Sequence, residues 1–479
     1  MELPDGKAVT YTYNARGELT DLALADWETQ STTFSYDHMG RLQSAAQLNG
    51  PQTSYHYDEA GHLLDLLHED GSSNTLAHFE YAVDERGNRI SATETLAQPS
   101  SGDLVLEITY DYDALARLIG ADYTIGTDTR EHDFTYDLAG NRTQEVVTLN
   151  STPTTTNYTY DIANRLSQIG GQSVDYDNAG RLTDDGTLTY TWDRANRLLD
   201  AGGSSYRYNG VGQRVDQTVS SVVTEYLLDV QPGLWQVLAA TTGSDVTRFV
   251  HGPRGLHLQQ QPNTDWVFPL HDGLNSLRSM VDEALDPLHL QNFDPYGNPF
   301  GVQGSMQSVF GFTGEPTDQN DLVYLRARYY SPVLAAFPSL DPLEGDIPEN
   351  RSLNRYGYVQ GNPANLIDPS GLIGERPPSG CQNQQQATCI GFPSGINSLD
   401  TNVKGIDAID VYRRTLYAHT GVALSTACGQ SVSWASYISS FTAAVLDIER
   451  KIGRSFRSVF GELEFRLHHN MPLNATGVY

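Results

Sequence analysis

A short pattern of aromatic, polar and aliphatic positions recurs through the first half of the chain. It reads aromatic-x-Tyr-Asp, two residues, Gly, Ala or Asn, one polar residue and a Leu-like residue, as in FSYDHMGRLQ and YTYDIANRLS. Because neighbouring side chains of a strand point to opposite faces, aromatic-x-aromatic places two large rings on one face. Asp starts a turn by bonding its own backbone, and Gly supplies a positive φ. Each unit therefore predicts one antiparallel β-hairpin.

Ten such units follow one another, and their spacing predicts shorter hairpins toward the end of the series. The intervals between central aromatics range from 16 to 31 residues, and the last three are 16 each. A long antiparallel sheet hides its edges and buries one face most readily by coiling round on itself. The first unit is complete by residue 20 although terminal repeats are usually atypical, so we expect this chain to be the C-terminal part of a longer repeat protein. The central aromatics are Tyr13, Tyr36, Tyr57, Tyr81, Tyr112, Tyr136, Tyr160, Tyr176, Trp192 and Tyr208.

The pattern changes after residue 372. Residues 373–400 are rich in Pro, Gly, Gln and Ser, which predicts a linker. Between Trp434 and Leu463 apolar residues step by three or four, which predicts an amphipathic helix packed on its neighbours. No apolar run reaches the roughly 18 residues that a membrane-spanning helix needs. The sequence therefore predicts a β-rich body, a linker and a small helix-rich tail, with no transmembrane segment.

Composition and charge narrow the classes of partner that the body is expected to bind. Hydrophobic residues make up 39% of the chain and 27 residues are Tyr, which suits sheets faced with amphipathic aromatics. The net charge is −29, and all of the acidic excess precedes residue 373 because the tail is close to neutral, so we expect the body to repel nucleic acid and anionic membranes. The opening MELPD has neither the basic start nor the apolar run of a signal peptide. The three cysteines all lie in the tail, and their odd number and wide spacing argue against a disulfide framework.

The repeats resemble the YD repeats of the RHS family, which includes the C components of bacterial Tc toxins and the teneurin shell. The stretch GFTGEPTDQNDLVYLRARYYSPVLAAFPSLDP, followed by RSLNRYGYVQGNPANLIDPSGL, is similar to the RHS repeat-associated core. The resemblance covers about residues 8–372. It implies a mainly β fold, in which residues 1–245 form a spiralling shell of YD-repeat hairpins, a partial cocoon. Residues 246–372 are then the core with a self-cleavage motif, and residues 373–479 a variable C-terminal domain whose linker ends near residue 400.

The resemblance also implies a function. Family members cut their own chain after a DPxGL motif, which leaves the C-terminal segment, often a toxin, free inside the shell. The matching positions here make Leu372–Ile373 the scissile bond and make Asp341, Asp368 and Arg328 the catalytic residues. Two neighbouring carboxyls cannot both ionise cheaply, so one keeps a proton and the pair offers an acid and a base. Such a pair activates water without a metal or another cofactor.

The family also predicts the partners and the location of the chain. Its own tail is the expected cargo, with a Tc-type or secretion-system partner and a cognate immunity protein. The chain would be secreted or displayed at a cell surface as part of a larger delivered protein. Two other classes of function stay open, namely an adhesion protein whose YD repeats bind carbohydrate and an inactive fragment of a larger Rhs protein.

The cleavage motif has an ordinary structural interpretation as well. Asp-Pro-x-Gly is first of all a turn, and DPYG at Asp294–Gly297 has the same form with no expected chemistry. The first motif reads DPLEG, one residue longer than DPxG, and the interval to the second motif is longer than is usual in the family. The extra residues, around EGDIPENRS, either loop out or displace Asp341, in which case Asp346 is the local alternative.

Weaker candidates lie elsewhere in the chain. Cys428 stands near a predicted helix start, where a thiolate is stabilised, and with His468 or His469 it would form a Cys–His hydrolase. The sequence HHN also resembles nuclease His motifs, although only nine residues follow it. The histidines of the body are scattered without ligand spacing, so the sequence predicts no metal site.

Overall fold

A computed structural model describes residues 1–378 except 26–29, 101, 231–233, 264, 306–307 and 345–351, together with the backbone of 422–426 and 463–467. The chain divides into two compact units. The first contains Met1–Tyr206 and Val215–Ser394, and the second contains Arg207–Arg214 and Gly395–Tyr479. In the part of the chain that the structure describes, the regular elements are β-strands and short 3-10 turns.

Strands β1–β15 form one antiparallel sheet in which each strand pairs with its neighbours in the chain. Meandering hairpins of this kind are what the repeated Asp turns require. The strands are β1 Ala8–Tyr13, β2 Leu19–Ala25, β3 Ser31–Tyr36, β4 Leu42–Gln47, β5 Gln52–Tyr57, β6 Leu63–Glu69, β7 Thr75–Val83, β8 Arg89–Ala97, β9 Asp103–Tyr112, β10 Leu118–Ile125, β11 Asp128–Tyr136, β12 Arg142–Leu149, β13 Thr152–Tyr160, β14 Leu166–Ile169 and β15 Gln172–Ser173.

A short two-stranded pair follows, and a second sheet then contains β18–β29, again in chain order. Strands β16–β19 have only two to four residues each, which confirms the shorter hairpins predicted where the repeat interval is 16. The strands are β16 Asp175–Tyr176, β17 Leu182–Asp184, β18 Tyr190–Trp192, β19 Leu198–Ala201, β20 Ser204–Tyr208, β21 Arg214–Val219, β22 Val222–Asp229, β23 Gln236–Thr242, β24 Asp245–Gly252, β25 Gly255–Gln260, β26 Trp266–His271, β27 Leu277–Val281, β28 Pro287–Phe293 and β29 Pro299–Gly304.

Each repeat builds the predicted turn, as the hairpin of β3 and β4 illustrates. The strand β3 ends at the central aromatic Tyr36, and Asp37 follows. One oxygen of Asp37 accepts hydrogen bonds from the backbone N–H groups of Met39 and Arg41, both at 2.9 Å. The Arg41 guanidinium donates to the other oxygen of Asp37 at 2.6 Å. The Asp and Arg of the repeat therefore close the turn.

The central tyrosine and the arginine of a repeat also join one hairpin to the next. The Tyr36 hydroxyl donates to the Leu19 carbonyl of the preceding hairpin at 2.9 Å. The Tyr136 hydroxyl makes the same bond to the Leu118 carbonyl at 2.7 Å. Arg41 Nη1 donates forward to the Asp58 carbonyl of the next turn at 2.7 Å. These bonds give a physical reason for Tyr rather than Phe at the central position, because only a hydroxyl reaches the neighbouring backbone.

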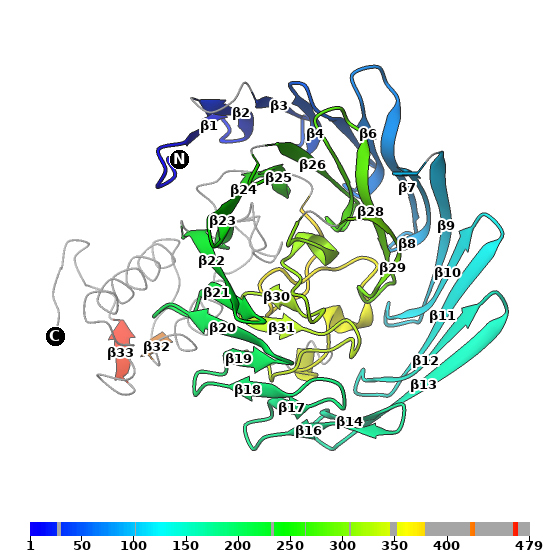
Figure 1. Cartoon of the computed structure of the whole chain (residues 1–479). Coiled ribbons are helices and arrows are strands. Elements are labelled where there is room, and N and C mark those ends of the chain that lie inside the picture. The colour runs from blue at the N-terminus through cyan, green and yellow to red at the C-terminus, as the bar shows by residue number, and fades with distance from the viewer. Residues whose placement is uncertain are drawn as a thin grey trace. The chain divides into compact units, whose positions relative to one another are not determined.

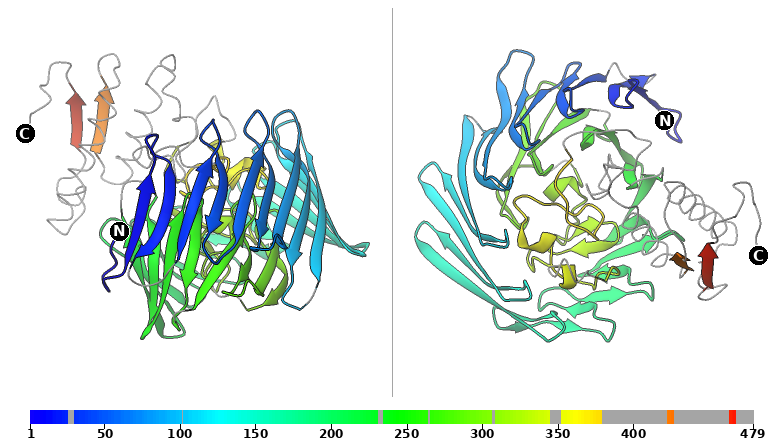
Figure 2. Two further views of the ribbon diagram at one scale, coloured as in Figure 1. Left: turned by 90° about the horizontal axis from the view of Figure 1, so that it is seen from above. Right: turned by 180° about the vertical axis from the view of Figure 1, so that it is seen from behind.

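Within the first unit the strands follow a spiral path. Figures 1 and 2 show β1–β13 curving round in chain order, with β24–β29 on the inner side of that curve. Side chains from the two layers meet, since the rings of Phe34 and His257 lie 5.3 Å apart and those of Tyr123 and Phe300 lie 5.5 Å apart. Their shared apolar core includes Phe34, Leu66, Phe79, Leu106, Trp266, Phe268 and Leu290. The predicted mainly β fold of spiralling YD-repeat hairpins is therefore confirmed.

Beyond residue 378, the described part of the tail consists of two short strands. Val422–Thr426 (β32) and Leu463–Leu467 (β33) pair in parallel. Leu463, the last position of the predicted helical stripe, lies in a strand instead, and the prediction was wrong there because LEFRL alternates apolar and polar residues with the period of a strand. The rest of that stripe and the candidates Cys428, His468 and His469 lie outside the described residues. Among the residues that the structure does describe, no helix is long and apolar enough to cross a membrane.

Candidate self-cleavage site

The last part of the core, after residue 304, folds into short elements on the inner side of the spiral, drawn in yellow-green and yellow in Figure 1. Its elements are η1 Phe312–Gly314, β30 Val323–Leu325, β31 Arg328–Tyr330 and η3 Val359–Gly361. Tyr330 stacks on Tyr358 with 3.9 Å between ring centroids, and Phe337 lies edge-on to both. The hairpin of β30 and β31 pairs Leu325 with Arg328, so the Arg328 side chain starts from a buried and rigid base.

Arg328 is the centre of the candidate site. Its guanidinium lies over the Phe337 ring, 3.6 Å from the ring centroid, and is only 5% exposed. Arg328 Nη2 lies 2.6 Å from Asp341 Oδ2 and 3.9 Å from Asp368 Oδ2. Arg328 Nε donates to the carbonyl of Gly371, the residue before Leu372. One cation therefore holds both predicted catalytic carboxylates and the backbone next to the predicted scissile bond.

Asp368 binds the scissile segment directly. Its Oδ1 accepts hydrogen bonds from the backbone N–H of Leu372 at 2.9 Å and from that of Ile373 at 3.0 Å. The tight turn between them needs Gly371, whose φ is +71° and where a Cβ would come within 2.5 Å of the Leu325 carbonyl oxygen. The peptide nitrogen that hydrolysis would release is thus in contact with an aspartate oxygen.

Asp341 is held by its backbone, despite the longer motif. Its N–H donates to the Arg355 carbonyl at 3.0 Å, and the Arg355 guanidinium donates back to the Asp341 carbonyl at 2.9 Å from Nε. The two sides of the longer segment are therefore joined at Asp341 and Arg355. The alternative Asp346 lies outside the described residues.

Burial sets the electrostatics of the site. It raises the pKa of Asp341 to about 6 against the opposing effect of Arg328, and it raises the pKa of Asp368 although Arg328 and the Leu372 N–H oppose it. Burial lowers the pKa of Arg328, and the two aspartates offset this in part. A buried carboxyl pair with raised pKa values holds its protons to a higher pH than free carboxyls do, and such a pair can supply an acid and a base together.

Two further buried acids adjoin the site and escaped the sequence analysis. Burial raises the pKa of Glu315 to about 7, although its carboxylate lies 2.7 Å from Arg326 Nη1. Burial, together with the charge of Asp368, raises the pKa of Glu375 to about 8. No repeat marks either residue, and Glu375 follows the region covered by the family resemblance. Only their tertiary neighbours identify them.

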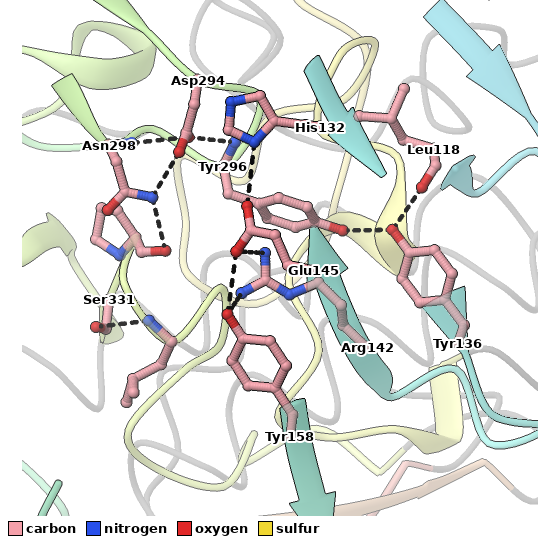
Figure 3. A network of polar contacts seen from close by, with 12 residues as sticks. Leu118, His132, Tyr136, Arg142, Glu145, Tyr158, Asp294, Tyr296, Asn298 and Ser331 are labelled. Atoms are coloured by element: carbon pink, nitrogen blue, oxygen red, sulfur yellow. Dashed lines mark hydrogen bonds and ion pairs between the residues drawn. The ribbon is translucent and has the colours of Figure 1, made fainter. Parts of the chain in front are cut away.

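The DPYG motif provides an internal comparison. Asp294 Oδ1 accepts from the backbone N–H of Tyr296 and Asn298, both at 2.9 Å, and Asp294 Oδ2 accepts from the Asn298 amide at 2.8 Å. Burial raises the pKa of Asp294 too. Its bonds are those of a turn, and Figure 3 shows that turn lying against a polar network from β11–β13. The sequence Asp-Pro-x-Gly thus forms one turn, at Asp294, that packs against the repeats and another, at Asp368, that lies beside Arg328.

An arginine at a position where most repeats have leucine connects the repeats to the DPYG turn. Most repeats place Leu after the turn, buried as in Leu118 and Leu166, whereas GNRT places Arg142 there. Arg142 Nη2 donates to the Tyr158 hydroxyl at 2.9 Å, and its Nη1 lies 3.4 Å from Glu145 Oε2. Its guanidinium also lies over the Tyr296 ring of the DPYG turn (Figure 3). The Arg-for-Leu exchange is the sequence signal that could have predicted this docking point.

Among the described residues, two clusters each bring three possible metal ligands within 4.8 Å of one another. His132, Glu145 and Asp294 form one of them, where Arg130 donates to His132 Nε2 at 2.9 Å and Arg142 pairs with Glu145 Oε2, so two of the three residues already contact an arginine. Asp65, His78 and Glu80 form the other, on the solvent side of β6 and β7, with His78 Nε2 2.8 Å from Asp65 Oδ2. This second cluster has the geometry of an ordinary surface ion pair.

Similar proteins match both the repeats and the core. The Teneurin YD-shell family matches residues 84–363. The tRNA3(Ser)-specific nuclease WapA of Bacillus spizizenii is 29% identical over 380 residues, which cover 75% of this chain and 15% of that protein. The Probable deoxyribonuclease RhsB of Dickeya dadantii is 28% identical over 412 residues, which cover 78% of this chain and 25% of that protein. The chain thus spans a quarter or less of the length of these relatives.

Solved structures with the same fold belong to Tc toxins. The crystal structure of TcdB2-TccC3-Cdc42 aligns with a TM-score of 0.65 at 21% identity and covers 77% of this chain and 20% of that chain. A Tc holotoxin pore of Photorhabdus luminescens aligns with a TM-score of 0.56 at 19% identity and covers 76% of this chain and 21% of that chain. At such low identities the likeness shows a common fold.

Proposed function

Because the chain belongs to the Teneurin YD-shell family, we propose that it is the shell-and-core part of an RHS-type carrier. The carrier encapsulates its variable C-terminal domain and releases it by cutting its own backbone between Leu372 and Ile373. The observation that carries the proposal is the position of Arg328, which lies 2.6 Å from Asp341 and 3.9 Å from Asp368 while its Nε donates to the Gly371 carbonyl. An ordinary turn needs none of these contacts.

The proposed reaction is a hydrolysis in which the two aspartates divide the proton transfers. Asp341, the more exposed of the two and paired with Arg328, takes a proton from a water molecule that adds to the Leu372 carbonyl carbon. Asp368, in contact with the Ile373 nitrogen, gives its proton to that nitrogen as the C–N bond breaks. The products are the carboxylate of Leu372 and the amine of Ile373, and the Arg328 charge stabilises the developing oxyanion.

The fold of the relatives extends the proposal to partners and location. The proteins similar to this chain include relatives named as nucleases and a Tc holotoxin. We therefore expect the tail to be a toxin carried as cargo, with a Tc-type or secretion-system partner and an immunity protein, and the whole to be secreted or displayed on a cell. The acidic body favours protein partners over nucleic acid.

A denaturing gel of the purified full chain tests the cut. We expect a separate fragment of residues 373–479, whose first residue is Ile373 by N-terminal mass spectrometry, and we expect Asp368→Asn to abolish it. Asp294→Asn is the matched control, because it makes the same exchange in the DPYG turn and leaves the cleavage site unchanged. A wild-type chain that stays whole would reject the carrier proposal in favour of an adhesion protein or an inactive Rhs fragment.

A further inference from the structure

The chain does not leave the core at the predicted scissile bond. Two residues later, Glu375 forms an antiparallel bridge with Ile367, with hydrogen bonds of 2.7 and 2.8 Å between their backbones. Gly374, which lies between Ile373 and Glu375 in the chain, packs against Val359, and a Cβ on Gly374 would come within 3.1 Å of the Val359 Cα. The residues after the cut therefore continue along the surface that presents Asp368.

Two arginines join the next residues to parts of the molecule that are distant in the sequence. Arg376 donates from Nη1 to the Gly87 carbonyl at 2.7 Å and from Nη2 to the Arg86 carbonyl at 3.0 Å. Arg254, at the turn between β24 and β25, donates to the Pro378 carbonyl at 2.8 Å. The segment Ile373–Pro378 is thus fixed at Asp368, at Ile367, at a repeat turn and at the second sheet. None of these contacts depends on the bond between Leu372 and Ile373.

We infer that the shell contains a binding site for the new amino terminus of the product, with Asp368 as the acceptor of the Ile373 ammonium and Arg376 and Arg254 as clamps. The ligand class is a peptide with a free α-amine, Ile-Gly-Glu-Arg-Pro-Pro. This inference rests on the proposed cleavage and adds to it that the cut alone does not detach the tail. The shell holds the first six residues of the product by contacts that are already present before the cut.

Hydrolysis strengthens the central contact of this site. Before the cut, the Ile373 amide donates a neutral hydrogen bond to Asp368 Oδ1 at 3.0 Å. Water then enters the bond, Leu372 gains a carboxylate and the Ile373 nitrogen becomes an α-amine, which is protonated below pH about 8. Hydrogen bonds between ionised groups are roughly twice as strong as neutral ones. After the cut, the Ile373 ammonium and the Asp368 carboxylate form an ion pair, and Arg328 Nε still donates to the carbonyl of Gly371, the residue before the new Leu372 carboxylate.

Buried Glu375 adds a second titratable acid to the site. Its side chain is 7% exposed, and its Oε1 has no hydrogen-bond partner. At neutral pH burial keeps this acid protonated, and raising the pH ionises it beside Asp368. The α-ammonium loses its proton over the same interval. Loss of the ammonium charge weakens the contact with Asp368, so alkaline pH should loosen the product terminus.

The experiment measures whether the Ile373 amine is covered in the cut full-length protein. An α-amine-selective aldehyde, 2-pyridinecarboxaldehyde, is applied to native and to urea-unfolded samples, and mass spectrometry follows the modification of the 373–479 fragment. We expect labelling to be at least about tenfold slower in the native sample, a ratio equivalent to about 1.4 kcal/mol of protection. Arg376→Ala and Arg254→Ala should each raise the native labelling rate several-fold. Arg16→Ala, at an exposed repeat turn, is the matched control and should leave the rate unchanged.

The outcomes separate this inference from the proposed cleavage. Equal labelling of native and unfolded samples would overturn it while the gel still showed the cut, even if the tail co-eluted with the shell through enclosure alone. Slow labelling that neither arginine variant changes would also overturn it, because the cover would then come from elsewhere. A chain that stays whole on the gel would overturn the cleavage and the inference together.

Discussion

The hydroxyl oxygens of Tyr136 and Tyr296 lie 2.7 Å apart and join the sixth YD repeat to the DPYG turn of the core. The Tyr136 hydroxyl donates to the Leu118 carbonyl, so Tyr296 is the donor of the bond between the two tyrosines. Tyr136, which joins neighbouring repeats, therefore also contacts the DPYG turn of the core (Figure 3).

This pair should be energetically coupled. Tyr296→Phe removes a buried hydrogen bond and should lower the free energy of unfolding by about 0.5–1.5 kcal/mol. Tyr136→Phe should cost more, because it also leaves the Leu118 carbonyl without its donor. Urea denaturation of the two single variants and the double variant measures the coupling. Strictly additive effects would show that the bond contributes nothing to docking.

The rate of self-cleavage should depend on pH as a bell. Asp341 must be ionised to act as base, so the rate should rise as the pH increases through about 6. Asp368 must keep its proton to act as acid, so the rate should fall again at higher pH as that proton is lost. Because the two groups interact, the limbs report apparent pKa values of the pair. The fraction cut, followed on gels after refolding at each pH, measures the profile, and a rate independent of pH from 4 to 9 would contradict the assignment.

Arg328→Lys should abolish most of the cleavage even though the charge is kept. A lysine cannot hold Asp341 and the Gly371 and Arg355 carbonyls at once, whereas the guanidinium does so in its plane. By comparison with the loss of an oxyanion donor, we expect the rate to fall by about 10²–10³-fold. Arg16→Lys provides the control, since Arg16 pairs with Glu18 in a repeat turn. Cleavage at the wild-type rate in Arg328→Lys would remove Arg328 from the mechanism.

Restoring the usual leucine at the docking point should destabilise the protein. Arg142→Leu matches most of the other repeats, yet it leaves the carboxylate of Glu145 and the hydroxyl of Tyr158 without their cation. Breaking a buried pair in this way typically costs about 3–5 kcal/mol. Adding Glu145→Gln should recover part of the loss, because the unpaired charge is then gone. Thermal or urea unfolding measures both effects, and an Arg142→Leu variant as stable as the wild type would show that the network is not needed for docking.

Acid should weaken the contact between the two layers of the spiral through buried histidines. Burial lowers the pKa of His68 and His257 to about 4 and that of His271 to about 3. Because these folded-state values lie below the unfolded value of about 6.5, the unfolded chain binds protons first. The contribution of these histidines to stability should therefore be constant above about pH 7 and fall progressively as the pH drops through 6.5 toward 4. Urea midpoints against pH measure this, and replacing the three histidines by Gln should flatten the curve.

The repeats could be predicted from the sequence because their information is local. Aromatic alternation, an Asp that bonds its own backbone and a nearby Gly specify a hairpin without reference to the rest of the chain. The family resemblance likewise identified Asp341, Asp368 and Arg328 as residues to examine. Local patterns could not tell the Asp294 turn from the Asp368 turn, because the two share one form.

What distinguishes those turns is decided in the tertiary structure. Asp368 meets Arg328 only because β31 and the DPSGL turn pack together, and the burial that raises both aspartate pKa values depends on the whole core. Glu375, Arg376 and Arg254 acquire their roles from tertiary contacts. The contact between Arg254 and Pro378, for example, joins residues more than a hundred positions apart in the chain. Short-range periodicity determines strands and turns, whereas proton affinity and docking depend on which distant groups share a dry environment.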